Sequence, residues 1–271
     1  MTYQFADVNG TKIHYEERGK GTAVIFIHAG VVNSGMWNEQ MASLGQRYRV
    51  IRYDIRGWGE TADPAVVYSD HEDLYGLLTY LGVETAVLIG CSMGGKIALD
   101  FALTYPQMIA GLVLVGAGLG GYDFSMEGIL ERAEAMNAAY ERGELDLAVE
   151  ISTQVWYDGL NRSPDQVDAY GRSQIRQLIY HTFCLPEGSG KRQELSPPAI
   201  NRLAGITAPT LIVVGDHDAP DIQRIADLLQ DNLRHARKKT LADTAHFPNA
   251  EKPTEFNQIV LEFLAGETSE A

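Results

Sequence analysis

The sequence predicts an α/β protein with a doubly wound, mostly parallel sheet and an inserted helical segment. Short apolar runs rich in β-branched residues recur along the chain, and several end at glycine, as buried parallel strands do. Helical patterns separate these runs. A third observation is a stretch of about 80 residues that has helical spacing and no strand-like run, far longer than an ordinary connection.

The predicted strands of the core are the apolar runs at 13–16, 23–27, 50–54, 86–90, 112–116 and 210–215. The segment from Ile97 to Tyr105 places its apolar side chains on one face and stops at Pro106, as an amphipathic helix does. The strand pattern is interrupted by predicted helices at 128–139, 144–156 and 165–180. We therefore expect a discontinuous core, 1–120 and 201–271, with 121–200 as a helical lid.

Composition excludes several classes of protein. The chain of 271 residues is long enough to bury a core without disulfides or a structural metal, and its two cysteines suit a reducing cytosol. A formal charge of −14 argues against a nucleic-acid partner. The start of the chain lacks a secretory signal pattern, and no apolar run reaches the roughly 18 residues of a membrane span. The sequence predicts a cytoplasmic protein with no membrane partner, and oligomeric state is not predicted.

The sequence Gly90-Cys91-Ser92-Met93-Gly94 lies where an apolar strand gives way to a helix. A G-x-S-x-G pattern at such a junction makes a tight turn that exposes the serine hydroxyl above the edge of the sheet. The flanking glycines remove Cβ atoms that would clash. We therefore predict Ser92 as a nucleophile. Cys91 is one position too early and is expected to pack into the sheet.

A serine nucleophile needs a base, and the base needs an orienting acid. His246 is the predicted base, because it lies in a loop between an expected edge strand and the last helix. His217 is its one serious rival. The acid is expected in the loop after the strand at 210–215, and Asp218 is preferred to Asp216 because it lies three residues past Gly215, where the loop has turned over the sheet edge.

The oxyanion of an acyl-transfer reaction is expected to bind backbone amides. One is that of Met93, directly after the nucleophile, and the other comes from the loop after the strand at 23–27. Gly30 is the expected second donor, with Ala29 and Val31 as alternatives. His28 is expected to hold this loop through side-chain hydrogen bonds, and Trp37 is expected to pack beneath it.

Four segments together resemble the α/β-hydrolase superfamily: the Ser92 elbow, Asp54-Ile55-Arg56-Gly57-Trp58-Gly59-Glu60-Thr61, the stretch from Pro209 to Asp218, and the stretch from His246 to Pro253. Within it, the chain looks most like esterases and lactonases related to 3-oxoadipate enol-lactonase. The resemblance implies an eight-stranded sheet, a Ser92–His246–Asp218 triad and oxyanion amides at Gly30 and Met93. Many members have His-Gly where this chain has His28-Ala29, a departure at the oxyanion loop.

The function implied is a serine hydrolase of carboxylic esters or lactones that works through an acyl-enzyme and needs no cofactor. Some similar proteins open N-acyl-homoserine lactones, so these are among the expected small-molecule substrates. One alternative is a cofactor-free haloperoxidase or perhydrolase, and another is a small-molecule receptor of the same fold. No metal site is expected, because no His-x-x-His or carboxylate cluster has ligand spacing.

The lid is expected to lie over the strand ends, where ligands bind in such sheets. Its apolar and aromatic side chains are candidates for an acyl pocket. Of these, Trp156 and Tyr122 are the predicted substrate-binding residues.

Overall fold

The computed structural model of the chain describes residues 4–266. Within that range lies an eight-stranded sheet with the order β1-β2-β4-β3-β6-β7-β9-β10. The first two pairings in that order are antiparallel and the other five are parallel. The strands are β1 (Gln4–Val8), β2 (Thr11–Arg18), β3 (Ala23–Ile27), β4 (Arg49–Tyr53), β6 (Ala86–Cys91), β7 (Ile109–Val115), β9 (Thr210–Gly215) and β10 (Ala236–Leu241).

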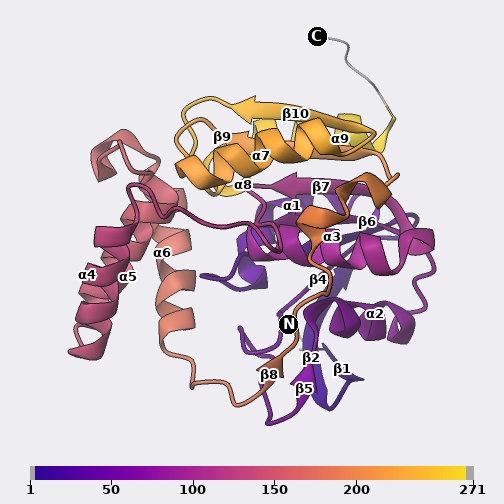
Figure 1. The fold of residues 1–271 in the computed structure, drawn as a ribbon, viewed down its shortest axis with the longest axis horizontal. Helices are drawn as coiled ribbons and strands as arrows, with labels where there is room; N and C mark the ends of the chain where they lie inside the picture. Colours follow the sequence, from indigo (N-terminus) through magenta and orange to yellow (C-terminus); the bar gives the residue numbers. More distant parts are fainter. Residues whose placement is uncertain (1–3, 267–271) are drawn as a thin grey trace.

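Helices cover both faces of this sheet (Figure 1). Successive residues of β3 show why: Ile25 belongs to one buried cluster and Phe26 to the other, because neighbouring side chains on a strand point to opposite faces. The first cluster includes residues of α2 (Asp70–Tyr80), α3 (Met93–Thr104) and α7 (Pro220–Asn232). The second includes residues of α1 (Asn38–Leu44) and α9 (Pro253–Leu264). The predicted α/β class with a mostly parallel sheet is confirmed.

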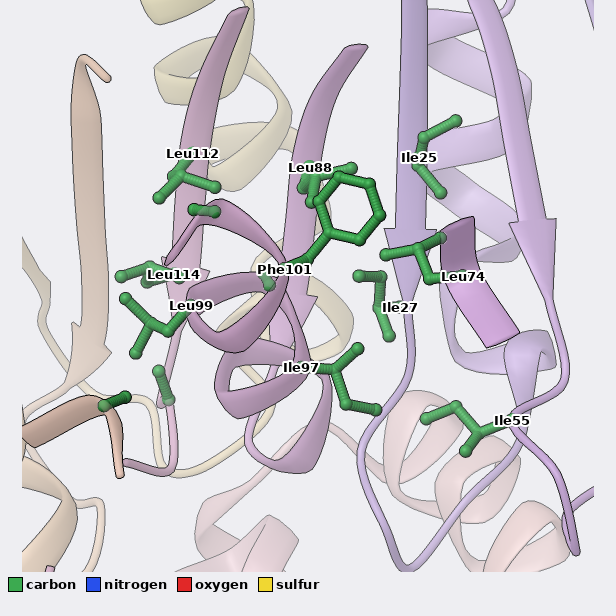
Figure 2. Packing of buried hydrophobic residues seen from close by; sticks show 14 of the residues in the cluster. Ile25, Ile27, Ile55, Leu74, Leu88, Ile97, Leu99, Phe101, Leu112 and Leu114 are labelled. Carbon is green, nitrogen blue, oxygen red and sulfur yellow. The ribbon is translucent and has the colours of Figure 1, made fainter. Parts of the chain in front are cut away.

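Helix α3 lies against the middle of the sheet and fixes the position of its own first turn. Figure 2 shows Ile97 and Phe101 of α3 directed toward the strands that carry Ile27 and Leu88. All four side chains are almost fully buried. Burial of an aromatic or aliphatic side chain of this size contributes about 2 kcal/mol each. The N-terminus of α3, which follows Ser92, is therefore held rigidly.

Strand bounds agree closely with the apolar runs of the sequence. The runs at 23–27 and 210–215 coincide with β3 and β9, and the run at 112–116 corresponds to the longer β7. β1 is an edge strand that the sequence pattern did not single out. The short helices of the described chain are α8 (Pro248–Glu251) and the 3₁₀ turns η1 (Ser34–Trp37), η2 (Pro106–Met108), η4 (Pro164–Gln166), η5 (Ala199–Asn201) and η6 (Leu203–Gly205).

Between β7 and β9 the chain forms three longer helices that stand to one side of the sheet (Figure 1). They are α4 (Leu130–Glu141), α5 (Leu145–Thr153) and α6 (Ala169–Phe183), and α5 continues into a π-helical turn, η3 (Gln154–Asp158). α6 contacts η1 and α8 of the core. The ends of the predicted core at residues 1–3 and 267–271 lie outside the described residues.

A small second sheet joins this insertion to the core. β5 (Val67–Tyr68) pairs in parallel with β8 (Lys191–Arg192). Neither strand has a recognisable sequence pattern, because each is two residues long. No helix within residues 4–266 combines the length and the apolar character needed to cross a membrane.

Candidate active site

The predicted nucleophile lies at the junction of β6 and α3. Ser92 has φ 53° and ψ −113°, a backbone conformation that few non-glycine residues adopt. The neighbouring glycines allow it: a Cβ on Gly90 would lie 2.2 Å from the carbonyl oxygen of Gly94, and a Cβ on Gly94 would lie 2.2 Å from that of Ile27. The sharp turn therefore depends on both glycines.

The predicted base and acid are in direct contact. His246 Nδ1 donates to the carboxylate of Asp218, with both oxygens 3.0 Å away, and both residues are buried. Asp218 follows β9 and His246 follows β10, two adjacent parallel strands whose carboxyl ends share one edge of the sheet. The bond fixes the imidazole tautomer and leaves Nε2 as an acceptor. Asp218 also accepts a hydrogen bond from the amide of Ala219 at 2.7 Å.

The alternative acid, Asp216, and the alternative base, His217, lie near the buried pair but outside it. Asp216 accepts from the amide of Thr244 at 3.3 Å, and its carboxylate is well exposed. The imidazole of His217 is partly exposed and approaches the carboxylate of Asp216 at 3.9 Å. Neither side chain takes part in the buried pair.

The elbow and the His246 loop lie side by side. The thiol of Cys91 is fully buried and lies 3.7 Å from the carbonyl oxygen of His246. Burial, and secondarily the negative charge of Asp218, raise the pKa of this thiol well above its ordinary value, so Cys91 remains a neutral packing residue. The expectation that Cys91 packs into the sheet is confirmed.

Gly116 is a site residue that the sequence analysis missed. It follows β7, has φ +47°, and lies against the buried pair: a Cβ here would be 3.0 Å from Asp218 Oδ2 and 3.1 Å from His246 Nδ1. The residue therefore leaves room for the predicted base and acid. Its position at the end of a central strand, one residue past Val115, was the available signal.

The hydrogen bonds of the loop after β3 bear on two of the three candidate oxyanion donors, Ala29 and Gly30. The amide of Ala29 donates to Met36 Sδ at 3.4 Å. The carbonyl of Ala29 accepts from His28 Nδ1 at 2.8 Å and from the amide of Val32 at 3.3 Å. The Ala29 carbonyl and the Gly30 N–H belong to the same peptide and point in opposite directions. The Gly30 N–H therefore points away from His28 and Val32, which donate to that carbonyl.

Gly30 also lies next to the predicted first donor. A Cβ on Gly30 would be 3.7 Å from Met93 Cβ. The carbonyl of Gly30 accepts from the indole Nε1 of Trp58 at 2.6 Å, a bond that the sequence analysis did not foresee. His28 holds the loop from the other side, because its Nε2 accepts from the amide of Ile55 at 2.9 Å. Burial lowers the pKa of His28, which keeps this imidazole neutral and able to accept.

Asp54 joins this loop to its neighbours. Its carboxylate accepts from the amides of Ser34 (2.9 Å) and Glu60 (3.0 Å) and from His14 Nδ1 (2.8 Å). Burial opposes ionisation, but the hydrogen bonds from His14, from Ser34 and from the amide of Glu60 together hold the pKa of Asp54 below its ordinary value. The ionised carboxylate thus organises the backbone around the expected oxyanion site.

A cavity of about 660 Å³ opens beside Ser92. Its apolar wall comes mainly from residues at or next to the two ends of the insertion, and not from the helices α4, α5 or α6: the residues are Leu119, Tyr122, Phe124, Leu195 and Pro198, with Met93 of α3. Its polar wall contains Lys96 and Asp100 of α3 and Glu194. Tyr122, a predicted substrate-binding residue, therefore does line this cavity.

Trp156, the other predicted substrate-binding residue, lies elsewhere. Its ring centroid is 4.7 Å from that of His246, and its carbonyl accepts from the His246 amide at 3.2 Å. It is not among the residues that line the cavity beside Ser92. Trp37 is fully buried and stacks on Phe26 of β3, with the ring centroids 5.1 Å apart.

The insertion is bound to the His246 loop through a buried cation. The guanidinium of Arg162 donates to the carbonyls of Asp158 (2.7 Å) and Asp243 (2.7 Å) and to the carboxylate of Glu251 (2.6 Å). Glu251 in turn accepts from the amide of Ala245 at 2.8 Å, directly before His246. Burial, opposed by Arg162, raises the pKa of Glu251 to about 7.

At its start the insertion is fastened by another buried carboxylate. Asp221 of α7 accepts from the hydroxyl of Ser125 and the amide of Met126, both at 2.9 Å. Within residues 4–266, no group of three or more His, Cys, Asp or Glu residues is arranged to hold a metal ion.

A parallel sheet with a nucleophile-type turn after a central strand defines the class of α/β-fold hydrolases. Residues 22–253 match the family described as the alpha/beta hydrolase fold. The chain therefore belongs to the α/β-hydrolase family, as its sequence motifs predicted.

The relatives within this family are of several kinds. The chain is 28% identical over 291 residues to the 2-hydroxy-6-oxo-6-phenylhexa-2,4-dienoate hydrolase of Comamonas testosteroni, covering 95% of this chain and 93% of that protein. A thermophilic esterase from Thermogutta terrifontis superposes with a TM-score of 0.79 at 25% identity, covering 98% of this chain and 99% of that one. Est816, described as an N-acyl homoserine lactone degrading enzyme, superposes with a TM-score of 0.73 at 26% identity, covering 96% of this chain and 100% of that one.

Proposed function

We propose that the protein is a serine hydrolase of carboxylic esters or lactones. The observation that carries the proposal is the buried His246–Asp218 pair next to the strained turn at Ser92: the Cys91 thiol of that turn lies 3.7 Å from the carbonyl oxygen of His246, and Ser92 borders a cavity of about 660 Å³. Ser92 is the proposed nucleophile, His246 the base and Asp218 the acid. The amides of Gly30 and Met93 are the proposed oxyanion donors.

In the first half-reaction, His246 Nε2 takes the proton of Ser92 Oγ as the oxygen attacks the substrate carbonyl. Asp218 holds the imidazolium through Nδ1–H. The amides of Gly30 and Met93 stabilise the negative oxygen of the tetrahedral intermediate, and each such donor typically contributes a factor of about 100 to 1,000 in kcat. His246 then protonates the alcohol that leaves.

In the second half-reaction, His246 removes a proton from water, which attacks the acyl-enzyme and releases the acid. When the substrate is a lactone, the alcohol remains attached to the acyl chain, and the product is a hydroxy acid. Trp156 is proposed to cover the imidazole of His246, because the two rings are in contact.

The charges along the cavity favour a substrate without a carboxylate. Lys96 is the one cation among the described residues that line it, and its ammonium group already contacts the carboxylates of Asp100 and Glu194. An incoming carboxylate would have to compete with both. Neutral esters and lactones, including the N-acyl-homoserine lactones that Est816 is described as degrading, meet no such opposition.

The second candidate is cleavage of a carbon–carbon bond. It is favoured by the 28% identity, over nearly the whole chain, to a dienoate hydrolase whose substrate, as named, contains a ketone and a carboxylate but no ester. The same serine, base and oxyanion donors can serve both reactions, so the choice rests on the substrate.

A turnover panel distinguishes the two candidates. We expect kcat/KM on p-nitrophenyl esters or γ-lactones, N-acyl-homoserine lactones among them, to exceed that on 2-hydroxy-6-oxo-6-phenylhexa-2,4-dienoate. The reverse order would establish the carbon–carbon reaction as the main one. Lactones compared with open-chain esters of matched length then separate the two ester classes.

Replacing the nucleophile tests the assignment of Ser92. The Ser92→Ala variant is expected to lose about 1,000-fold or more in kcat on the best substrate, because the oxyanion donors and binding remain but no acyl-enzyme can form. Its thermal unfolding should stay near that of the wild type. Ser173→Ala, a change at an exposed helical position, is the matched control. Ordinary turnover by Ser92→Ala would overturn the assignment.

A further inference from the structure

The cavity continues along α3 away from the nucleophile. Ser92, Lys96 and Asp100 are spaced four residues apart, so they lie on one face of the helix. All three line the same cavity. At about 1.5 Å of rise per residue, Asp100 lies about 12 Å from Ser92 along the helix axis. A substrate bound at Ser92 can therefore extend toward Asp100.

The far end of the cavity contains a buried carboxylate that is only partly satisfied. Asp100 is 3% exposed, and its Oδ2 lies 3.2 Å from Lys96 Nζ. Its Oδ1 has no hydrogen-bond partner among the described residues. Burial, opposed by the ammonium of Lys96, raises the pKa of Asp100. A buried acceptor without a partner destabilises the folded protein until a hydrogen-bond donor reaches it.

The surrounding charges leave this end acidic. Lys96 is shared with the carboxylate of Glu194. Behind it, Arg192 lies 3.2 Å from Asp70, whose Oδ1 also lacks a partner within the described residues. The three carboxylates of Asp70, Asp100 and Glu194 thus share two cations, Lys96 and Arg192. The imidazole of His71 also faces Asp100.

We propose that this end of the cavity is a subsite for an ammonium group on the substrate, held by Asp100 with help from Glu194. The inference rests on the proposed ester or lactone hydrolysis and names the kind of substrate that the site prefers. An ammonium group brings three N–H donors and a positive charge to the unmet oxygen of Asp100. A carboxylate in the same place meets like charge, and a methyl group satisfies nothing.

Three p-nitrophenyl esters that differ only at the far end of the acyl chain test the inference. They are the 8-ammonio-octanoate, the nonanoate and the mono-ester of octanedioic acid, assayed at pH 7.5. We expect kcat/KM for the ammonium ester to exceed that for the neutral ester about tenfold, and the carboxylate ester to be the slowest. Equal or reversed rates for the ammonium and neutral esters would overturn the inference.

Variants assign the preference to the carboxylates. Asp100→Asn should bring the ratio of ammonium to neutral ester close to one, and because the readout is a ratio, a general loss of activity divides out. Glu194→Gln, a change at a largely exposed side chain, should lower the ratio in part and remains informative if Asp100→Asn does not fold. Asp231→Asn, an exposed carboxylate of α7, is the control of equal charge change and should keep the full ratio.

Different results would overturn the hydrolase proposal and the inference of an ammonium subsite. Absence of turnover on all three esters by the wild type would overturn the hydrolase proposal and this inference together. Turnover of all three with no dependence on the charge at the chain end, or a preference that persists in both Asp100→Asn and Glu194→Gln, would overturn this inference alone.

Discussion

Gly116 shows how one missing side chain makes room for the proposed catalytic pair, His246 and Asp218. It adopts φ +47° at the end of β7, and the space where its Cβ would stand is bounded by Asp218 Oδ2 and His246 Nδ1. The side chains of Asp218 and His246 cannot easily move aside, because both are buried and hydrogen-bonded to one another. A methyl group here must displace the base, the acid or both.

Gly116→Ala is therefore expected to lower kcat by about 100-fold with a smaller effect on KM, because displacement of a catalytic group by a fraction of an ångström to 1 Å has effects of that size. The positive φ adds a stability loss of about 1 to 2 kcal/mol. Steady-state kinetics and denaturant unfolding measure the two effects.

Gly143→Ala is the matched control for backbone strain. Gly143 has φ +75°, and a Cβ there would meet no atom within 4 Å. This variant should lose a similar amount of stability while keeping its kcat. Equal kcat losses in the two variants would show that Gly116 acts through general destabilisation and not through the catalytic pair.

At the residue scale, the sequence predicts the parts of the site that are encoded locally. The turn at Ser92 follows from two glycines within two positions of it, and Asp218 and His246 follow from their places after strands. Gly116, Trp58 and Arg162 could not be assigned in this way. Each acts on a segment distant in sequence, and only the folded chain brings the partners together.

At the scale of elements, Arg162 couples the π-helical turn η3 to the loop that carries His246. Its guanidinium bonds to carbonyls on both sides and to Glu251, and the side chains of Arg162 and Glu251 are almost fully buried. The same η3 segment carries Trp156, whose ring contacts His246. The pair thereby holds this part of the insertion against His246, the proposed base.

At pH 8, where Glu251 is ionised beside Arg162, Arg162→Met should destabilise the protein by up to about 3 to 5 kcal/mol, because it leaves the Glu251 carboxylate buried without its cation. The double variant Arg162→Met/Glu251→Gln should recover part of that loss, since no charge then remains unpaired. Denaturant unfolding of the two single variants and the double variant measures the coupling. Arg142→Met, which breaks an exposed ion pair with Glu144, should change stability little. Strictly additive effects at 162 and 251 would contradict the coupling.

The sequence predicts strands well where every residue of the strand is buried and apolar. β3 and β9 are buried at every position and were located to the residue. β1 alternates exposed and buried residues over five positions and exists through its pairing with β2. β5 and β8 are strands only because they pair with each other, although they are far apart in the sequence. Periodicity cannot detect such contacts, because it reads only neighbours in sequence.

For the whole molecule, buried carboxylates give stability a pH dependence of defined sign. Burial, opposed by Arg192 and Lys96, raises the pKa of Asp70 from 3.8 to about 6. The folded state thus binds a proton more tightly than the unfolded state. This contribution is present at low pH and is lost as the pH rises through about 6. Glu251, with a pKa of about 7, acts in the same direction.

We therefore expect the Asp70 contribution to fall by about 1 to 1.5 kcal/mol between pH 5 and pH 7. The free energy of unfolding of the wild type minus that of Asp70→Asn should decrease by this amount over the same range. Asp231→Asn, at an exposed position, should show no such trend. A difference that stays constant or grows with pH would contradict the sign.

Both ends of the insertion are fastened to the core, at Asp221 by hydrogen bonds to residues 125 and 126 and at β5 by pairing with β8. The apolar wall of the cavity lies mainly at these anchored ends and its polar wall mainly on α3, whereas α4, α5 and α6 do not line it. A chimera that exchanges only the helical middle would therefore inherit the cavity beside Ser92. Transplanting the proposed selectivity would require moving the two anchored ends together with the face of α3 that carries Lys96 and Asp100.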